Sequence, residues 1–103
     1  METKELKVAI IGAGNMGGAI ARGLAKGRMI SASHISVSDI NESNLSAIRA
    51  AFPAINTYTA NAQMVEDAHI IILAVKPWLV EPVAEEIEKD FGFKPDFEKA
   101  KYF

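Results

Sequence analysis

The sequence predicts an α/β protein built on a doubly wound parallel sheet of about four strands. Short apolar runs alternate along the 103 residues with longer stretches whose apolar residues recur at helical spacing, as in consecutive βαβ units. The run Ile70–Val75 is apolar at every position, as a strand covered on both faces requires. A glycine cluster, Gly12–Gly17, directly follows the first apolar run. These three observations together favour this fold class.

The first half of the chain contains two strand–helix pairs. A strand is predicted at residues 6–11, and apolar residues at helical spacing predict a helix over 15–26 with Gly27 as its end signal. A second strand is predicted at residues 34–39. Asn41 then supplies an N-cap, and the acid that follows it stands in the first turn of a second helix that a proline closes.

The second half predicts two further pairs, with shorter elements. A short strand at residues 55–58 is followed by a brief helix at 61–66. The apolar run 70–75 is the clearest strand of the chain, and a helix with three apolar residues on one face is expected over 78–90. We therefore expect residues 1–90 to form one domain.

Residues 91–103 differ in kind from the rest of the chain. They hold five of its eight aromatic residues, among lysines and Pro95, and show no strand or helix period. We expect this aromatic-rich tail to pack against the open flank of the fourth strand or to mediate self-association into a homo-oligomer, because an unpaired strand edge invites pairing. A segment without a structural role is the alternative.

Composition excludes several classes of function. Eleven basic and thirteen acidic residues give a formal charge of −2, so nothing favours nucleic acid as a partner. The chain has no cysteine, which excludes a disulfide framework and a cysteine nucleophile. The N-terminal apolar stretch is too short for a signal peptide or a membrane span, and we expect a cytoplasmic protein with no membrane partner. No metal site and no catalytic residue are predicted.

Six residues directly after the first strand have the spacing G-x-G-x-x-G. They are Gly12, Ala13, Gly14, Asn15, Met16 and Gly17. Because a predicted strand precedes them, a predicted helix follows and an acid, Asp39, ends the next strand, the pattern is typical of a Rossmann-type dinucleotide site. The first glycine permits the tight turn, the second lets the backbone approach a pyrophosphate, and the third lets the helix lie close to the strand. A glycine-rich turn without a ligand is the alternative.

Asp39 bears on the choice of cofactor. At the end of the second strand its carboxylate can accept hydrogen bonds from the adenosine ribose hydroxyls, and it would repel the 2′-phosphate of NADP(H). The next residues are Ile40 and Asn41, so no arginine follows to bind that phosphate. The predicted cofactor is therefore NADP(H) or NAD(H), with Asp39 favouring NAD(H). The alternative role of Asp39 is that of a turn or cap acid.

Right-handed crossovers predict the strand order 3-2-1-4, in which the ends of strands one and four flank the ligand site of an open α/β sheet. The loop after the fourth strand therefore lies beside the glycine loop. It consists of Ala74, Val75, Lys76 and Pro77. Lys76 is either a phosphate contact or the point where a buried strand meets water. Asn61 is interpreted first as a helix cap, which can also touch a ligand, and His34 and His69 are expected at the opposite edge of the sheet.

Together these motifs resemble one family, the pyrroline-5-carboxylate reductases. The resemblance covers about residues 6–87. It rests on Ile10–Gly17 with Ala19, Ile20, Gly23 and Leu24, on Ile35–Ser38, on Asn61 and Val65, and on Ala74–Pro77. The combination of I-G-A-G-N-M-G with A-V-K-P is more specific than the glycine spacing, which many dehydrogenase families share.

The resemblance implies reduction of the cyclic imine pyrroline-5-carboxylate to proline, the last step of proline synthesis, with NADPH or NADH. It implies that Ile11–Met16 hold the cofactor's pyrophosphate and that Ser38 and Asp39 face the adenosine ribose and any 2′-phosphate. It also implies that Asn61 and the loop Ala74–Pro77 line the ribose and nicotinamide side.

Two departures from the family's pattern limit these expectations. Many members have serine, asparagine or arginine where this chain has Asp39-Ile40, so a preference for NADP(H) does not carry over. The fifth strand and the helical domain that forms the family's dimer and imine site have no counterpart in the 103 residues, so the imine substrate requires that missing domain. Two other hypotheses stay open: a stand-alone, non-catalytic dinucleotide-binding module, and the cofactor domain of another reductase, such as an F420-dependent NADP reductase.

Overall fold

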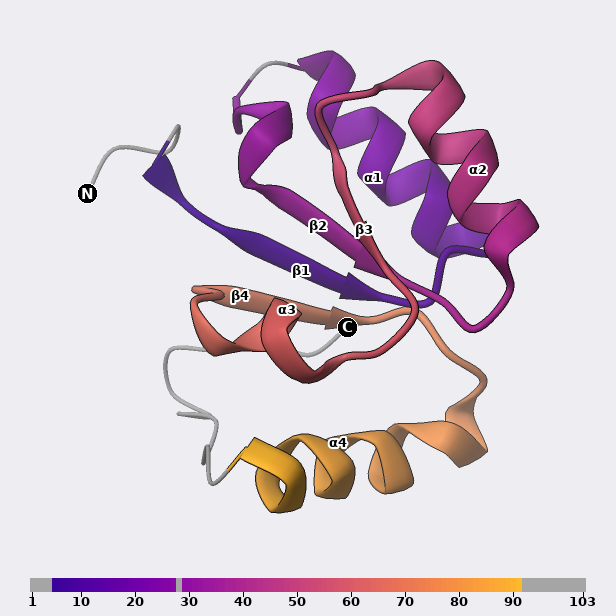
Figure 1. The fold of residues 1–103 in the computed structure, drawn as a ribbon, viewed down its shortest axis with the longest axis vertical. Coiled ribbons are helices and arrows are strands. Elements are labelled where there is room, and N and C mark those ends of the chain that lie inside the picture. The colour runs from indigo at the N-terminus through magenta and orange to yellow at the C-terminus, as the bar shows by residue number, and fades with distance from the viewer. Residues whose placement is uncertain (1–4, 28, 92–103) are drawn as a thin grey trace.

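The computed structural model of the chain describes residues 5–27 and 29–91. They form four strands and four helices that alternate in sequence (Figure 1). In chain order these are β1 (Val8–Ile11), α1 (Asn15–Gly27), β2 (Ile35–Ser38), α2 (Glu42–Ala51), β3 (Asn56–Tyr58), α3 (Ala62–Glu66), β4 (Ile70–Leu73) and α4 (Pro77–Phe91). A single 3-10 turn, Ala32–His34, directly precedes β2.

The four strands form one parallel sheet in the order β3-β2-β1-β4, which confirms the predicted order. The central strand β1 is in register with both neighbours. Its last residue, Ile11, pairs with Ser38 of β2 and with Leu73 of β4, and Ser38 pairs with Tyr58 of β3. Because all four strands end at the same level, the segments that follow them meet along one side of the sheet, called here the carboxyl edge.

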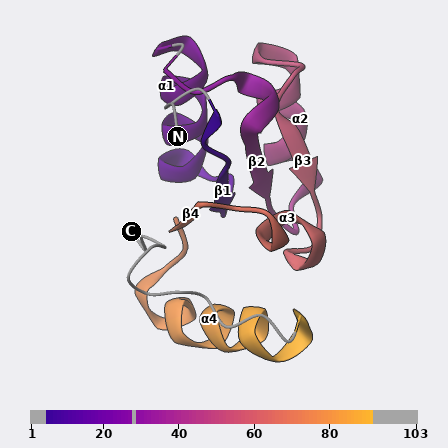
Figure 2. The same cartoon turned by 90° about the vertical axis from the view of Figure 1, so that its left-hand side faces the viewer.

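Helices cover both faces of the sheet, as a doubly wound fold requires (Figures 1 and 2). Alternate residues of β1 divide the core between the two faces. Val8 and Ile10 belong to a buried cluster with α1 and α2, whereas Ala9 and Ile11 belong to a second cluster with α3 and α4. All four residues of β1 are buried, which explains the continuous apolar sequence of this strand.

The fourth strand is shorter than predicted. Its ladder ends at Leu73, and the N–H of Ala74 donates to the carbonyl oxygen of Ile11 at 2.9 Å before the chain turns away from the sheet. Pro77 is the first residue of α4, one residue earlier than predicted. A proline fits this position because the first N–H of a helix has no partner within the helix.

The predicted tail at residues 91–103 lies outside the described residues, except that Phe91 ends α4. The boundary between domain and tail therefore stays a prediction. In the described sheet, β4 stands at an edge, as expected from the strand order. Within residues 5–27 and 29–91, no helix is long and apolar enough to cross a membrane.

Candidate dinucleotide-binding site

A cavity of about 830 Å³ lies at the carboxyl edge of the sheet. Its wall is built from the segments that follow all four strands, together with one face of α4. A volume of this size is in the range of small-molecule and cofactor sites. The cavity brings together most of the residues that the sequence predicts for the site. These are Ile11, Gly12, Gly14, Asn15, Met16, Ser38, Asp39, Asn61, Ala74, Val75, Lys76 and Pro77.

At two positions of the loop, the fold leaves no space for any residue other than glycine. Gly12 has a φ of +106°, and a Cβ there would lie 2.4 Å from the carbonyl oxygen of Ala74. A Cβ at Gly17 would lie 1.7 Å from the carbonyl oxygen of Gly12. The first glycine therefore makes the turn, and Gly17 lets α1 lie against that turn, as the sequence predicts.

Gly14 differs from both. It is exposed, it lines the cavity, and a Cβ there would meet no atom within 4 Å. Neither backbone conformation nor packing within the described residues requires a glycine at this position. Because Gly14 has no side chain, the cavity stays open beside the N-terminus of α1.

The N–H groups of the loop divide into paired and unpaired donors. Gly12 donates to the carbonyl oxygen of Ser38 at 2.8 Å, and Ala13 donates to Oδ2 of Asp39 at 2.9 Å. Three exposed residues follow at the start of α1, and their N–H groups donate to no other described residue. They are Gly14, Asn15 and Met16. A helix N-terminus with free donors and a partial positive charge is suited to an anion.

Two predicted site residues, Ala13 and Gly17, do not line the cavity. Ala13 is only 5% exposed and packs in the core beneath α1, with its N–H already bonded to Asp39. Gly17 is buried against the turn. Both residues are buried behind the residues that line the cavity.

The half-buried carboxylate of Asp39 is the most connected polar group of the site. Oδ1 accepts a hydrogen bond from the Asn41 N–H at 2.9 Å, and Oδ2 accepts from the Ala13 N–H and from Nδ2 of Asn44 at 3.2 Å. Burial raises the pKa of this carboxyl, but the hydrogen bonds that it accepts outweigh burial and hold the pKa below its ordinary value. Asp39 is therefore a charged turn acid, and it still lines the cavity.

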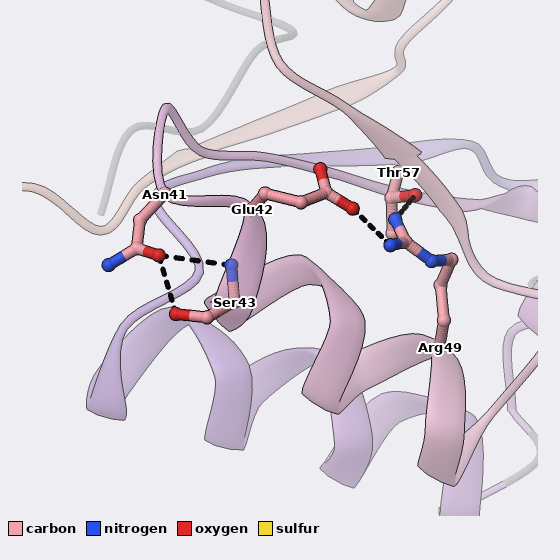
Figure 3. A network of polar contacts seen from close by, with 5 residues as sticks. All are labelled: Asn41, Glu42, Ser43, Arg49 and Thr57. Atoms are coloured by element: carbon pink, nitrogen blue, oxygen red, sulfur yellow. Dashed lines mark hydrogen bonds and ion pairs between the residues drawn. The ribbon is translucent and has the colours of Figure 1, made fainter.

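The N-terminal end of α2 is fixed by side-chain contacts on both sides of the helix (Figure 3). Oδ1 of Asn41 accepts from the Ser43 N–H at 3.0 Å, which confirms the predicted cap. Arg49 forms an ion pair with Glu42 and donates to Oγ1 of Thr57 in β3 at 2.8 Å. The helix is thus tied to the sheet beyond its apolar core.

Asn61 does not act as predicted. It stands at the N-cap position of α3, but its side chain makes no capping hydrogen bond. Its Oδ1 accepts instead from the hydroxyl of Ser38, a residue that is only 2% exposed. The interpretation of Asn61 as a cap is wrong because a buried hydroxyl, which needs a partner, lies within reach of its side chain.

Lys76 and the two histidines lie where the sequence places them. Lys76 is exposed and lines the cavity between β4 and α4. His34 and His69 stand just before β2 and β4, at the opposite edge of the sheet, and neither lines this cavity. Nδ1 of His69 accepts from the Lys7 N–H at 2.9 Å, so this side chain has a local structural contact.

The cavity also contains residues that sequence reasoning missed. They are Ile40, Thr59, Ala60, Leu79, Val83 and Glu86. Thr59 and Ala60 directly follow β3, so the rule that placed the ends of strands one and four at the site could have found them. Leu79 and Val83 belong to the apolar stripe of α4, and helical spacing does not tell a core contact from a cavity wall.

The fold and the site define a class of protein. A parallel sheet in this order, with a G-x-G-x-x-G turn between β1 and α1 and an acid at the end of β2, is the Rossmann-type domain of NAD(P)-dependent oxidoreductases. The family model described as NADP oxidoreductase, coenzyme F420-dependent, matches residues 7–94. The chain belongs to this family.

Several of the similar proteins are pyrroline-5-carboxylate reductases. Pyrroline-5-carboxylate reductase from Methanosarcina acetivorans is 34% identical over 84 residues, which are 82% of this chain and 31% of that protein. The solved structure of a pyrroline-5-carboxylate reductase from Coxiella burnetii has a TM-score of 0.74 at 24% identity, over 94% of this chain and 35% of that one. That of Plasmodium falciparum pyrroline carboxylate reductase, with NADP bound, has a TM-score of 0.69 at 23% identity, over 84% and 30%.

These comparisons confirm the resemblance predicted from the motifs. The similar proteins are oxidoreductases, and the structural likeness supports the Rossmann-type fold. The chain spans about a third of the length of the curated relative from Methanosarcina acetivorans.

Proposed function

We propose that the chain is the NAD(P)H-binding domain of a pyrroline-5-carboxylate reductase. Three features support this assignment: the cavity at the carboxyl edge, the unpaired N–H groups at the start of α1, and similarity to these reductases over most of the chain. The observation that carries it is Gly14, a glycine that the protein's own packing does not require and that borders the cavity.

In this proposal each part of the wall has a role toward the cofactor. The N–H groups of Gly14, Asn15 and Met16 would bind the pyrophosphate, supported by the turn that begins after Ile11. Ser38 and Asp39 would face the adenosine ribose. Asn61 and the loop Ala74–Pro77 would line the ribose and nicotinamide side.

The reaction itself requires more than this cavity. When bound, reduced nicotinamide supplies the hydride that adds to the C=N carbon of the imine, while the imine nitrogen takes up a proton. The described residues would bind and orient the cofactor for this step. In this proposal the imine is bound by residues that correspond to parts of the relatives that this chain does not span. A biosynthetic reductase of this kind is expected in the cytoplasm.

For cofactor choice, we propose that NADH binds at least as well as NADPH. Asp39 is charged at neutral pH because its pKa lies below the ordinary value, and it lines the cavity. The next residue, Ile40, is 94% exposed and offers no charge to a 2′-phosphate. A carboxylate in this place repels that phosphate and can accept a hydrogen bond from a ribose hydroxyl.

A second candidate is the cofactor domain of an F420-dependent NADP reductase. The description of the matching family favours it. The similarity to pyrroline-5-carboxylate reductases and the A-V-K-P loop beside the glycine turn favour the first candidate. Both candidates use the same cavity for a nicotinamide dinucleotide.

The variant Gly14→Val tests the proposed site. A Cβ at this position would meet no protein atom within 4 Å, and the residue lines the cavity, so we expect an unchanged fold and a loss of at least tenfold in affinity for NADH and NADPH. Gly23→Val is the matched control, because a Cβ at Gly23 also meets nothing within 4 Å and this residue does not line the cavity. Calorimetry that shows equal cofactor binding by the two variants would refute the assignment.

A further inference from the structure

The carboxylate of Asp39 joins two segments that are far apart in sequence. On one side it accepts from the Ala13 N–H, in the middle of the glycine loop. On the other side it accepts from the backbone of Asn41 and the side chain of Asn44, at the start of α2. The glycine loop and the β2–α2 turn therefore donate hydrogen bonds to the same carboxylate. This set of hydrogen bonds is called here the Asp39 anchor.

Asn44 is the side-chain donor of this anchor, and it does not line the cavity. It lies half-buried in the first turn of α2, where its own N–H donates to the carbonyl oxygen of Asn41 at 3.1 Å. Its Nδ2 shares Oδ2 of Asp39 with the Ala13 N–H. The amide of Asn44 is thus one of three donors that hold the Asp39 carboxylate in its orientation toward the loop, and it is the only one of the three that comes from a side chain.

The amide of Asn44 contributes to this orientation without neutralising the charge of Asp39. Among residues 5–27 and 29–91, the ion pair recorded is that of Arg49 with Glu42, and Asp39 is not part of it. A carboxylate held by neutral donors keeps its full negative charge at the cavity wall. Without the Asn44 amide, only the N–H groups of Ala13 and Asn41 hold the carboxylate, so we expect it to be less constrained and its hydrogen bond with Ala13 to be weaker.

The orientation of Ala13 matters because the next three residues carry the unpaired N–H groups of the site. A loop held in one conformation before binding loses less conformational entropy when an anion binds. We propose that Asn44 is a positioning residue for cofactor binding: through Asp39 it holds the glycine loop in the conformation that directs the N–H groups of residues 14–16 into the cavity. This inference rests on the proposed function of the cavity.

Asn44→Ala tests the inference in the full chain. Removing a hydrogen bond to a charged group should weaken NADH binding about tenfold and accelerate amide hydrogen exchange at Ala13. Asn44→Leu removes the same donor with little change in volume, and it decides the question if the alanine variant does not fold. Calorimetry measures the affinity, and NMR measures exchange at Ala13 without cofactor.

Arg49→Met is the control variant. It removes side-chain contacts of the same helix to Glu42 and Thr57 (Figure 3) and leaves the Asp39 anchor in place. It should lower the melting temperature without changing NADH affinity or exchange at Ala13. Unchanged affinity and exchange in both Asn44 variants would overturn the positioning role alone. If the wild-type chain binds neither NADH nor NADPH, the proposed function fails and the positioning role fails with it.

Discussion

The carboxylate of Asp39 brings a negative charge to the cavity wall while its oxygen atoms anchor the glycine loop. From the sequence, Asp39 is either an acid that stabilises a turn or an acid that faces the cofactor. In the structure it stabilises the turn, and it also lines the cavity. Any substitution at this position therefore changes two properties together. Under the proposed function, the charge affects the choice between NADH and NADPH, and the anchor affects the affinity for both.

We expect Asp39→Ser to shift cofactor preference toward NADPH. Loss of charge repulsion worth about 1 kcal/mol should change the ratio of the two dissociation constants about fivefold, while loss of the anchor weakens NADH binding. Asp67→Ser is the control, because this exposed acid lies away from the carboxyl-edge cavity. Calorimetric titrations with both cofactors provide the ratio. A wild-type chain that prefers NADPH tenfold or more would contradict the role given to the charge.

Among the secondary-structure elements, α1 is the one whose placement depends most on a single residue. Its first turn lies against the turn after β1, and there is no room for a side chain at Gly17. Gly23, in the same helix, has open space around it. The two positions therefore predict opposite effects of the same substitution.

Gly17→Ala should destabilise the fold by about 1–3 kcal/mol, because α1 must move away from the Gly12 carbonyl group. Gly23→Ala should raise stability by up to about 1 kcal/mol, since alanine is the better helix former. Chemical denaturation of both variants measures these free energies of unfolding. Equal effects of the two substitutions would mean that the contact between α1 and the turn does not constrain the helix.

The strands, the helices and most of the cavity wall could be predicted from the sequence, because apolar runs and glycine spacing are local signals. The connection rule for parallel strands then placed Ala74–Pro77 beside the glycine loop. What could not be predicted depends on tertiary contacts. The side chain of Asn61 turns to the buried Ser38 hydroxyl, and Leu79 and Val83 line the cavity because of where α4 lies, which their helical spacing does not encode.

At the scale of the whole molecule, one parallel sheet brings the ends of four strands to a single cavity. The described residues form the wall of this cavity, while the chain spans only 31% of the length of the reductase from Methanosarcina acetivorans. Cofactor binding and catalysis are therefore expected to separate in this chain.

We expect the purified 103-residue chain to bind NADH but not to reduce pyrroline-5-carboxylate at a useful rate. Positioning of the two reactants supplies a large share of such rate enhancements, and the role proposed for the cavity is to bind the cofactor. A spectrophotometric assay of NADH oxidation, with a full-length pyrroline-5-carboxylate reductase as the positive control, checks this. Turnover comparable to that of the full-length enzyme would show that the chain also binds and orients the imine.

The central claim is that the cavity at the carboxyl edge binds a nicotinamide dinucleotide, and an NMR titration of the isotope-labelled chain with NADH tests it most directly. We predict saturable shifts of the amide resonances of Gly14, Asn15, Met16 and Lys76, which line the cavity. The amides of His34 and His69, at the opposite edge of the sheet, should not shift. Shifts confined to that opposite edge, or no saturable shifts with either NADH or NADPH, would contradict the claim.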